Sequence, residues 1–207
     1  MEFIDKIMYI NLDTRADRKV QIEEQFARVG IPSNKIERFS ALRHPNSNCA
    51  GCNLSHATAL RKAYESGYQN VLILEDDFNF IDDVELIHNS LSGFFKEIDE
   101  SWDAVLLTFG NQESTPCSDL LSRCHSAKNA AAYLVNRKQT LELSNLIFEA
   151  VEPLANTNMH WIYQNDIIWQ KCMKNNTWYH FNKRLGYQRA GFSDLSQCFR
   201  DYTDNGV

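Results

Sequence analysis

The strongest constraint on this chain is its alternation between short apolar segments and longer segments with helical spacing. Residues 7–10 are typical of a strand, and residues 15–29 are typical of a helix that ends at Gly30. Residues 36–39 follow as a second strand. A regular alternation of strands and helices is typical of a sheet that is covered by helices on both faces. We therefore predict a three-layer α/β domain with a mostly parallel central sheet.

The same alternation continues through the rest of the chain. We expect further helices from an Asn53 N-cap to a Gly67 stop, from an Asp82 or Asp83 N-cap to Ile98, and over 138–151 and 161–173. Further strands are predicted at 71–74, 104–109 and 130–135. The stretch 110–128 is polar, and the tail from residue 182 is polar and irregular.

Length and charge restrict the class of protein. With 207 residues the chain has room for one domain, 1–207, and hardly for two. The net charge is -6 and the basic residues are dispersed, which argues against a nucleic-acid partner. Apolar runs such as 71–74 are far shorter than a membrane span, and no signal-peptide core is visible. We therefore expect a cytoplasmic protein without a transmembrane segment.

The cysteines do not form an evident framework. Cys49 and Cys52 have the spacing of a redox pair or of half a zinc site, and His56 is near them. A zinc site usually shows a second, similarly spaced pair, and the sequence has none. We therefore interpret this pair as ordinary residues in the turn before a helix.

Three adjacent acids, Glu75, Asp76 and Asp77, follow directly after the apolar strand 71–74. Such charges repel one another unless a positive group offsets them, and a divalent cation is the simplest candidate. Carboxylate oxygens suit Mg²⁺ or Mn²⁺, which often bridge to substrate phosphates. The alternative is that the two aspartates are turn residues and that Glu75 pairs with an arginine. The position of the acids at the end of a buried strand favours a nucleotide diphosphate site.

Other nucleotide-binding classes lack their signature here. The sequence has no Gly-rich Walker loop and no glycine fingerprint after the first strand, which disfavours ATPases and enzymes that bind dinucleotides in the usual way. A phosphohydrolase or nucleotidyltransferase with two cations usually needs more converging carboxylates than this single cluster provides.

Several segments together resemble glycosyltransferase family 25, the lipooligosaccharide-biosynthesis and procollagen-galactosyltransferase group. They are Tyr9-Ile10-Asn11-Leu12-Asp13 with Arg15, Asp17 and Arg18, then Gly51-Cys52 with Ser55-His56, then 71–77, and finally 188–194. The resemblance implies a GT-A type Rossmann-like fold, a UDP-sugar donor and a manganese or magnesium ion. It also implies inverting transfer of a hexose, galactose before glucose, to a hydroxyl of a glycan or protein acceptor.

The resemblance assigns donor contacts to several residues. Asn11 and Leu12 would lie against uracil and ribose, and Arg15 and Arg18 would either reach phosphate or pair with Asp13 and Asp17. Ser55 and His56 are expected in the first turn of their helix, where free backbone N–H groups favour an anion. The alternative for His56 is a hydrogen bond to a loop carbonyl.

The C-terminal run would complete the donor site. Gln188 and Arg189 would close over the donor phosphates, within an irregular segment, 182–207, that covers the site. The two residues lie in the last of the family-like segments.

The acidic triplet takes the place of the DXD motif of GT-A enzymes, with a third acid between. Asp77 is the expected metal ligand together with Asp76, and Glu75 or Asp76 lies nearer the ribose or the sugar. An inverting transfer also needs a general base. We assign this role to Asp166, which has aromatic and apolar neighbours that raise a carboxylate pKa.

Two alternatives remain open for these assignments. Asp194 is a second candidate for the base or for support of the metal site, and Asp166 alternatively caps or decorates a helix. For the whole protein, the alternative is a catalytically silent module that binds a nucleotide sugar. The complete acidic triplet favours an enzyme over that module.

Overall fold

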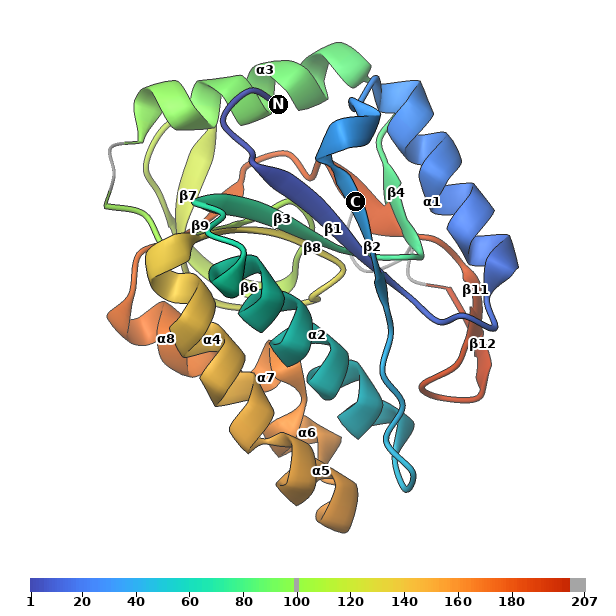
Figure 1. The fold of residues 1–207 in the computed structure, drawn as a ribbon. Coiled ribbons are helices and arrows are strands. Elements are labelled where there is room, and N and C mark those ends of the chain that lie inside the picture. Colours follow the sequence, from blue (N-terminus) through green and yellow to red (C-terminus); the bar gives the residue numbers. More distant parts are fainter. Residues whose placement is uncertain (99–100, 202–207) are drawn as a thin grey trace.

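The central feature of the fold is one large mixed sheet (Figure 1). The computed structural model describes residues 1–98 and 101–201. Its sheet strands are β1 (Lys6–Asn11), β2 (Ile36–Ser40), β3 (Asn70–Glu75), β5 (Ala104–Leu106), β6 (Gly110–Pro116), β7 (Leu121–Lys128), β8 (Ala132–Asn136) and β9 (Trp178–Phe181). In the described residues these eight strands lie in the order β2-β1-β3-β8-β5-β9-β7-β6.

Strand direction divides this sheet into two kinds of pairing. β1 pairs in parallel with β2 and with β3, and β5 pairs in parallel with β9. β8 and β7 run against their neighbours, so the other pairings are antiparallel. Six of the eight strands of the described sheet thus share one direction. The predicted mostly parallel α/β sheet is confirmed, with two reversed strands inserted into it.

Helices cover both faces of the sheet, as the alternation predicts (Figure 1). The four long ones are α1 (Ala16–Val29), α2 (Asn48–Glu65), α3 (Val84–Glu97) and α4 (Arg137–Glu149). Ile7 and Tyr9 of β1 pack in the layer of α1 and α3, whereas Met8 and Ile10 pack in the layer of α2 and α4. Successive strand residues point to opposite faces, so β1 is buried on both sides.

Several segments differ in secondary structure from what the sequence predicts. Residues 110–128 form the antiparallel hairpin β6–β7, and its outer strand is polar because it lies at the sheet edge. The predicted helix 161–173 is divided into α6 (His160–Tyr163), α7 (Asn165–Ile168) and α8 (Gln170–Asn175), after the short α5 (Val151–Thr157). β9 was not predicted.

The tail after residue 182 also differs from the prediction. It contains β10 (Gly186–Gln188), β11 (Gly191–Ser193) and β12 (Cys198–Arg200), where an irregular segment was expected. β10 pairs with β4 (Phe78–Phe80), and β11 pairs with β12. These strands are only three residues long, which is too short for a hydrophobic alternation to be recognised.

Helix α2 begins earlier than the sequence predicts. Its N-cap is Ser47, whose hydroxyl accepts a hydrogen bond from the Ala50 N–H at 3.2 Å. Asn53, the predicted cap, is fully buried, and its side chain binds the Tyr163 carbonyl and the Asn165 N–H. A residue type that is typical of helix caps is used here to connect α2 to the C-terminal helices.

Candidate functional site

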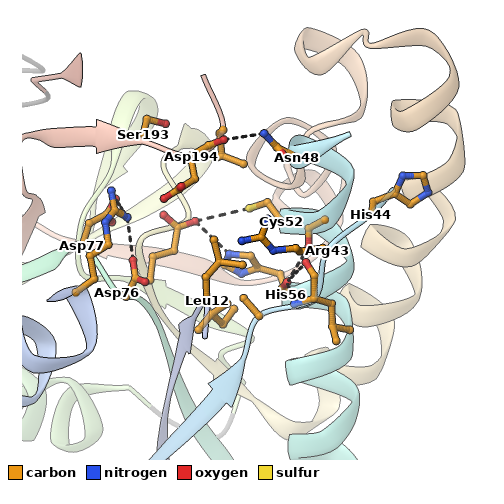
Figure 2. Close-up of a pocket in the computed structure, with 18 of the residues that line it drawn as sticks. Leu12, Arg43, His44, Asn48, Cys52, His56, Asp76, Asp77, Ser193 and Asp194 are labelled. Atoms are coloured by element: carbon orange, nitrogen blue, oxygen red, sulfur yellow. Dashed lines mark hydrogen bonds and ion pairs between the residues drawn. The ribbon is translucent and has the colours of Figure 1, made fainter. Parts of the chain in front are cut away.

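A cavity lies where the carboxyl ends of β1 and β3 meet helix α2 and the C-terminal strands (Figure 2). Its volume is about 160 Å³, similar to engineered cavities that hold one benzene-sized molecule. The charged side chains that line it in the described part of the chain are Arg18, Arg43, Glu75, Asp76, Asp77 and Asp194. The four carboxylates outnumber the two guanidinium groups, so the cavity attracts cations.

The acidic triplet lies at this cavity, as the sequence predicts. Glu75 ends β3, and Asp76 and Asp77 form the turn into β4. Figure 2 shows the two aspartates on one side of the cavity and α2, with Cys52 and His56, on the other. The alternative of two turn aspartates and a paired Glu75 is met in part, because both aspartates are turn residues, but the arginine pairs with Asp76 and Asp77 and not with Glu75.

Asp76 is held by donors on both carboxylate oxygens. Its Oδ2 accepts a hydrogen bond from Asn11 Nδ2 at 2.7 Å, and its Oδ1 lies 2.9 Å from Arg18 Nη1. Asn11 also accepts from Arg38 Nε at 2.9 Å. Asn11 therefore lies behind Asp76 as a support and is not among the residues that line the cavity.

Asp77 is less completely satisfied. Its Oδ2 lies 3.2 Å from Arg18 Nη1, whereas its Oδ1 is buried and has no hydrogen-bond partner among the described residues. Burial raises the pKa of Asp77 to about 7, and the nearby Glu75 charge adds to this rise. Gln188 lies close enough to oppose the rise, although its amide donates to Glu75 Oε2 at 3.2 Å. Asp77 therefore presents a buried acceptor that the protein itself leaves open.

The arginines at the start of α1 form ion pairs. Arg15 pairs with Asp17 at 2.8 Å and with Asp194 at 2.5 Å, and it does not line the cavity. Arg18 lines the cavity, pairs with both Asp76 and Asp77, and donates to the Phe192 carbonyl at 2.7 Å. Both arginines thus have carboxylate partners, and Arg18 is the cavity arginine that pairs with the two aspartates. Leu12 also lines the cavity, and its predicted contact with uracil and ribose stays a prediction.

Ser55 and His56 line the cavity, but not in the expected first helical turn. Because α2 begins at Asn48, their backbone N–H groups lie beyond the free N–H groups of the first turn. The Ser55 hydroxyl donates to the Gly51 carbonyl at 2.7 Å and accepts from the Leu42 N–H. Their predicted backbone anion site is therefore wrong.

His56 is buried in a network of polar side chains. Its Nδ1 lies 3.0 Å from the Tyr133 hydroxyl, and its Nε2 lies 3.2 Å from Glu75 Oε1. Cys52, one helical turn earlier, lies 4.0 Å from the same Glu75 oxygen. The alternative of a histidine bonded to a loop carbonyl does not describe these contacts. Sequence reasoning missed Tyr133, and it placed Cys52 in a turn because it started the helix too late.

Only some of the predicted C-terminal site residues line the cavity. Gln188 and Asp194 line the cavity, while Arg189 does not. Arg189 donates from its backbone N–H to the Asp77 carbonyl at 2.8 Å and from its side chain to Asn79 Oδ1 at 3.1 Å. Arg189 therefore holds the turn that carries the aspartates.

Asp166 lies outside the residues that line the cavity. Its Oδ2 accepts a hydrogen bond from the Asn129 N–H at 3.0 Å, just after β7. Burial raises the pKa of Asp166, and the charge of nearby Glu75 contributes to that rise. Asp166 lies in the first turn of α7, as in the alternative in which it decorates a helix, and its role as general base stays a prediction.

Comparisons with known proteins give similar folds without a family. No protein-family model matches the sequence, and no curated protein matches it. Solved structures with similarity include mannose-1-phosphate geranyltransferase from Thermus thermophilus, with 12% identity, 85% of this chain and 72% of that chain covered, and a TM-score of 0.48. A glycosyltransferase involved in the glycosylation of the major capsid of PBCV-1 has 12% identity, 86% and 91% coverage, and a TM-score of 0.46.

A third similar structure is the galactosyltransferase LgtC in complex with donor and acceptor sugar analogs. It has 13% identity, 84% of this chain and 72% of that chain covered, and a TM-score of 0.44. At TM-scores below 0.5 these similarities carry no argument about this chain, so membership of family 25 stays a prediction. Among the described helices, none has both the length and the apolar character needed to cross a membrane.

Proposed function

We propose that this protein is an inverting, metal-dependent glycosyltransferase of the GT-A type that transfers galactose or glucose from a UDP-sugar to a hydroxyl acceptor. The observation that carries the proposal is Asp77, a buried carboxylate with an unpartnered oxygen at the mouth of β3. The family 25 resemblance of the surrounding segments supports a sugar donor.

The residues present fit a Mn²⁺ or Mg²⁺ ion. Asp77 Oδ1 is an oxygen ligand without a partner in the described part of the protein, and hard divalent ions prefer such oxygens. Asp77 would hold the ion, while Asp76 is already engaged by Asn11 and Arg18. When bound, the cation would neutralise the charge that develops on the departing diphosphate. Arg18 would add a second positive group beside the same phosphates.

The donor would bind in the cavity next to the C-terminal strands. Ser193, Asp194 and Gln197 line the cavity from the described part of this segment, 182–201, and the partly open cavity has about the volume of one ring-sized group. A complete nucleotide sugar is larger than that volume, so the rest of the donor would extend through the open side of the cavity. We propose the covering role for the described part of the tail, in which Gln188 donates to Glu75, and residues 202–207 lie outside the described residues.

We assign the general base to Asp166, with Asp194 as the second candidate. The environment of Asp166 raises its pKa, as the role requires. Asp194 lines the cavity but is held by Arg15 at 2.5 Å, which favours a role in positioning. In this scheme Asp166 accepts the proton of the acceptor hydroxyl as that oxygen attacks the sugar.

The second candidate function is a silent module that binds a nucleotide sugar without turnover. One observation favours it: Arg18 already provides a positive partner for both Asp76 and Asp77. The acids are thus offset in part without a cation. A silent module would bind UDP with or without a chelator and would release no product.

The deciding experiment measures UDP release from UDP-galactose and UDP-glucose with Mn²⁺ and with a chelator. We expect release that the chelator abolishes and that Asp77→Asn reduces about 100-fold or more. The matched control is Asp103→Asn, another buried carboxylate, which accepts a hydrogen bond from the Thr177 N–H at 2.6 Å and does not line the cavity. Asp103→Asn should keep UDP release. Absence of chelator-sensitive release from either donor contradicts the proposal, and UDP binding without release then selects the silent module.

A further inference from the structure

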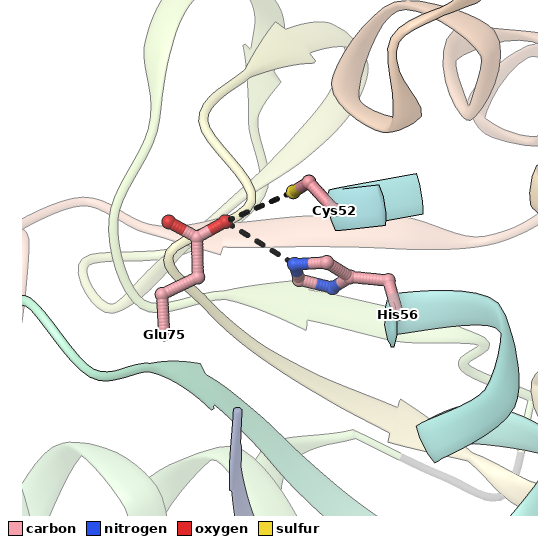
Figure 3. A group of neighbouring side chains, drawn as sticks. All are labelled: Cys52, His56 and Glu75. Atoms are coloured by element: carbon pink, nitrogen blue, oxygen red, sulfur yellow. Dashed lines mark hydrogen bonds and ion pairs between the residues drawn. The ribbon is translucent and has the colours of Figure 1, made fainter. Parts of the chain in front are cut away.

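One cluster near the cavity has the chemistry of a second kind of metal site (Figure 3). Cys52 Sγ, a ring nitrogen of His56 and a carboxylate oxygen of Glu75 all lie within 4.8 Å of one another. We propose that Cys52, His56 and Glu75 bind a zinc ion, or a similar borderline divalent metal, with one coordination position open to the cavity. This inference does not depend on the glycosyltransferase proposal.

The first support is the placement of the ligands on the backbone. Cys52 and His56 are four residues apart on α2, so their side chains project from the same face of the helix. Glu75 comes from the end of β3 on the opposite side, as Figure 3 shows. Two helix ligands at this spacing with a third from elsewhere form a known type of zinc site that keeps an open position.

The second support is that each ligand has its own outer partner. Asn165 Nδ2 lies 4.0 Å from Cys52 Sγ, the Tyr133 hydroxyl lies 3.0 Å from His56 Nδ1, and Gln188 Nε2 donates to Glu75 Oε2. Metal ligands are usually oriented by such contacts. With its proton on Nδ1 and donated to the Tyr133 oxygen, His56 would turn the lone pair of Nε2 towards the ion.

The third support is charge balance. Binding would release the thiol proton of Cys52, and the thiolate together with the Glu75 carboxylate would neutralise a divalent ion. His56 stays neutral in this arrangement. The site would therefore add no net charge to a cavity wall that already contains Asp76, Asp77 and Asp194.

The ligand set also identifies the class of ion. Sulfur and imidazole nitrogen prefer zinc and related borderline metals, whereas Mn²⁺ and Mg²⁺ prefer oxygen. The cluster is thus chemically different from the single open oxygen of Asp77. All three ligands line the cavity, so the open position would face any molecule bound there.

The test uses Co²⁺ as a spectroscopic probe on the full chain. We expect one equivalent to bind and give a thiolate-to-cobalt charge-transfer band, which Zn²⁺ then removes by displacement. Cys52→Ser should lose this band. Cys49→Ser is the matched control, because Cys49 lies three residues earlier on the same helix and outside the cluster. The proposal is overturned if the wild-type protein shows no band. It is also overturned if the band persists in Cys52→Ser or disappears in Cys49→Ser.

Two further variants keep the test decisive if Cys52→Ser does not fold. Tyr133→Phe removes only the outer partner of His56 and should weaken Zn²⁺ binding about tenfold. His56→Gln should weaken it more. Unchanged Zn²⁺ affinity in both variants would mean that the cluster is only a hydrogen-bonded support for Glu75. Asp77→Asn should keep the cobalt band while it loses donor turnover, which separates this proposal from the previous one.

Discussion

The two halves of the sheet differ in where they place their polar residues. In the parallel half, β2, β1 and β3 all end at the same edge, and this edge carries Asn11 and the acids that follow β3. In the antiparallel half, β7 runs against both β6 and β9, so its connections leave from both edges. Parallel strands therefore bring the candidate site residues together at one edge, whereas the hairpin mainly extends the sheet.

The largest test of this comparison concerns Asp166, the one proposed catalytic group that is attached to the antiparallel half. Asp166→Asn should reduce transfer about 100-fold or more, because the amide cannot accept the acceptor proton. Its oxygen can still accept the Asn129 N–H, so thermal stability should change little. Asp166→Ala should lose both transfer and stability. Normal transfer by Asp166→Asn would confine the chemistry to the parallel half.

The second test is the pH dependence of stability in metal-free protein. The pKa of Asp77 is about 7 in the folded state and about 4 when unfolded, so between these values the folded state binds more protons. Stability should therefore fall as pH rises from 4 to 7, by up to about 1.4 kcal/mol per pH unit. Asp77→Asn should reduce this slope in denaturant titrations, and burial of Asp76 and Asp166, which also raises their pKa values, would account for what remains. An equal slope in the variant would assign it to another group.

The third test concerns the strand that attaches the C-terminal segment to the parallel half. A Cβ on Gly186 would collide with the Phe78 ring and the Asn79 carbonyl, whereas one on Gly191 would meet nothing. Gly186→Ala should reduce the free energy of unfolding by about 1–3 kcal/mol. Gly191→Ala should change it by less than about 0.5 kcal/mol. Equal effects of the two substitutions would show that β10 does not need its close contact with β4.

The smallest test compares two polar residues of α2. Asn53→Ala would leave the buried Tyr163 carbonyl and Asn165 N–H unpaired, and should cost about 2 kcal/mol. Ser47→Ala removes only the N-cap and should cost about 1 kcal/mol. Chemical denaturation measures both. The reverse order would indicate that the helix end contributes more than the link between α2 and the C-terminal helices.

Most of the fold could be predicted because the long elements have clear patterns. The run 71–74 followed by acids indicated β3 and its polar end, and helical spacing indicated α1 and α3. The hairpin β6–β7 could not be predicted from an apolar pattern, because a strand at the sheet edge need not be apolar. Strands of three residues, such as β10, are specified by their partner β4 more than by their own sequence.

The candidate site could be predicted only where its residues are adjacent in one segment of the sequence. Glu75, Asp76 and Asp77 are adjacent in sequence, so their shared position was visible. The neighbours that determine their state come from distant segments: Arg18 lies 58 residues from Asp76, and Gln188 lies 113 residues from Glu75. Such contacts depend on the tertiary fold and leave no local pattern.

Arg18 connects three parts of the molecule through one guanidinium group. It belongs to α1, it pairs with Asp76 and Asp77, and it donates to the Phe192 carbonyl of β11. The electrostatic state of the two aspartates and the anchoring of β11 are consequently linked in thermodynamic terms. A cation that binds these carboxylates would weaken their ion pairs with Arg18. The hydrogen bond from Arg18 to the Phe192 carbonyl, which anchors β11 beside the cavity, would then weaken as well.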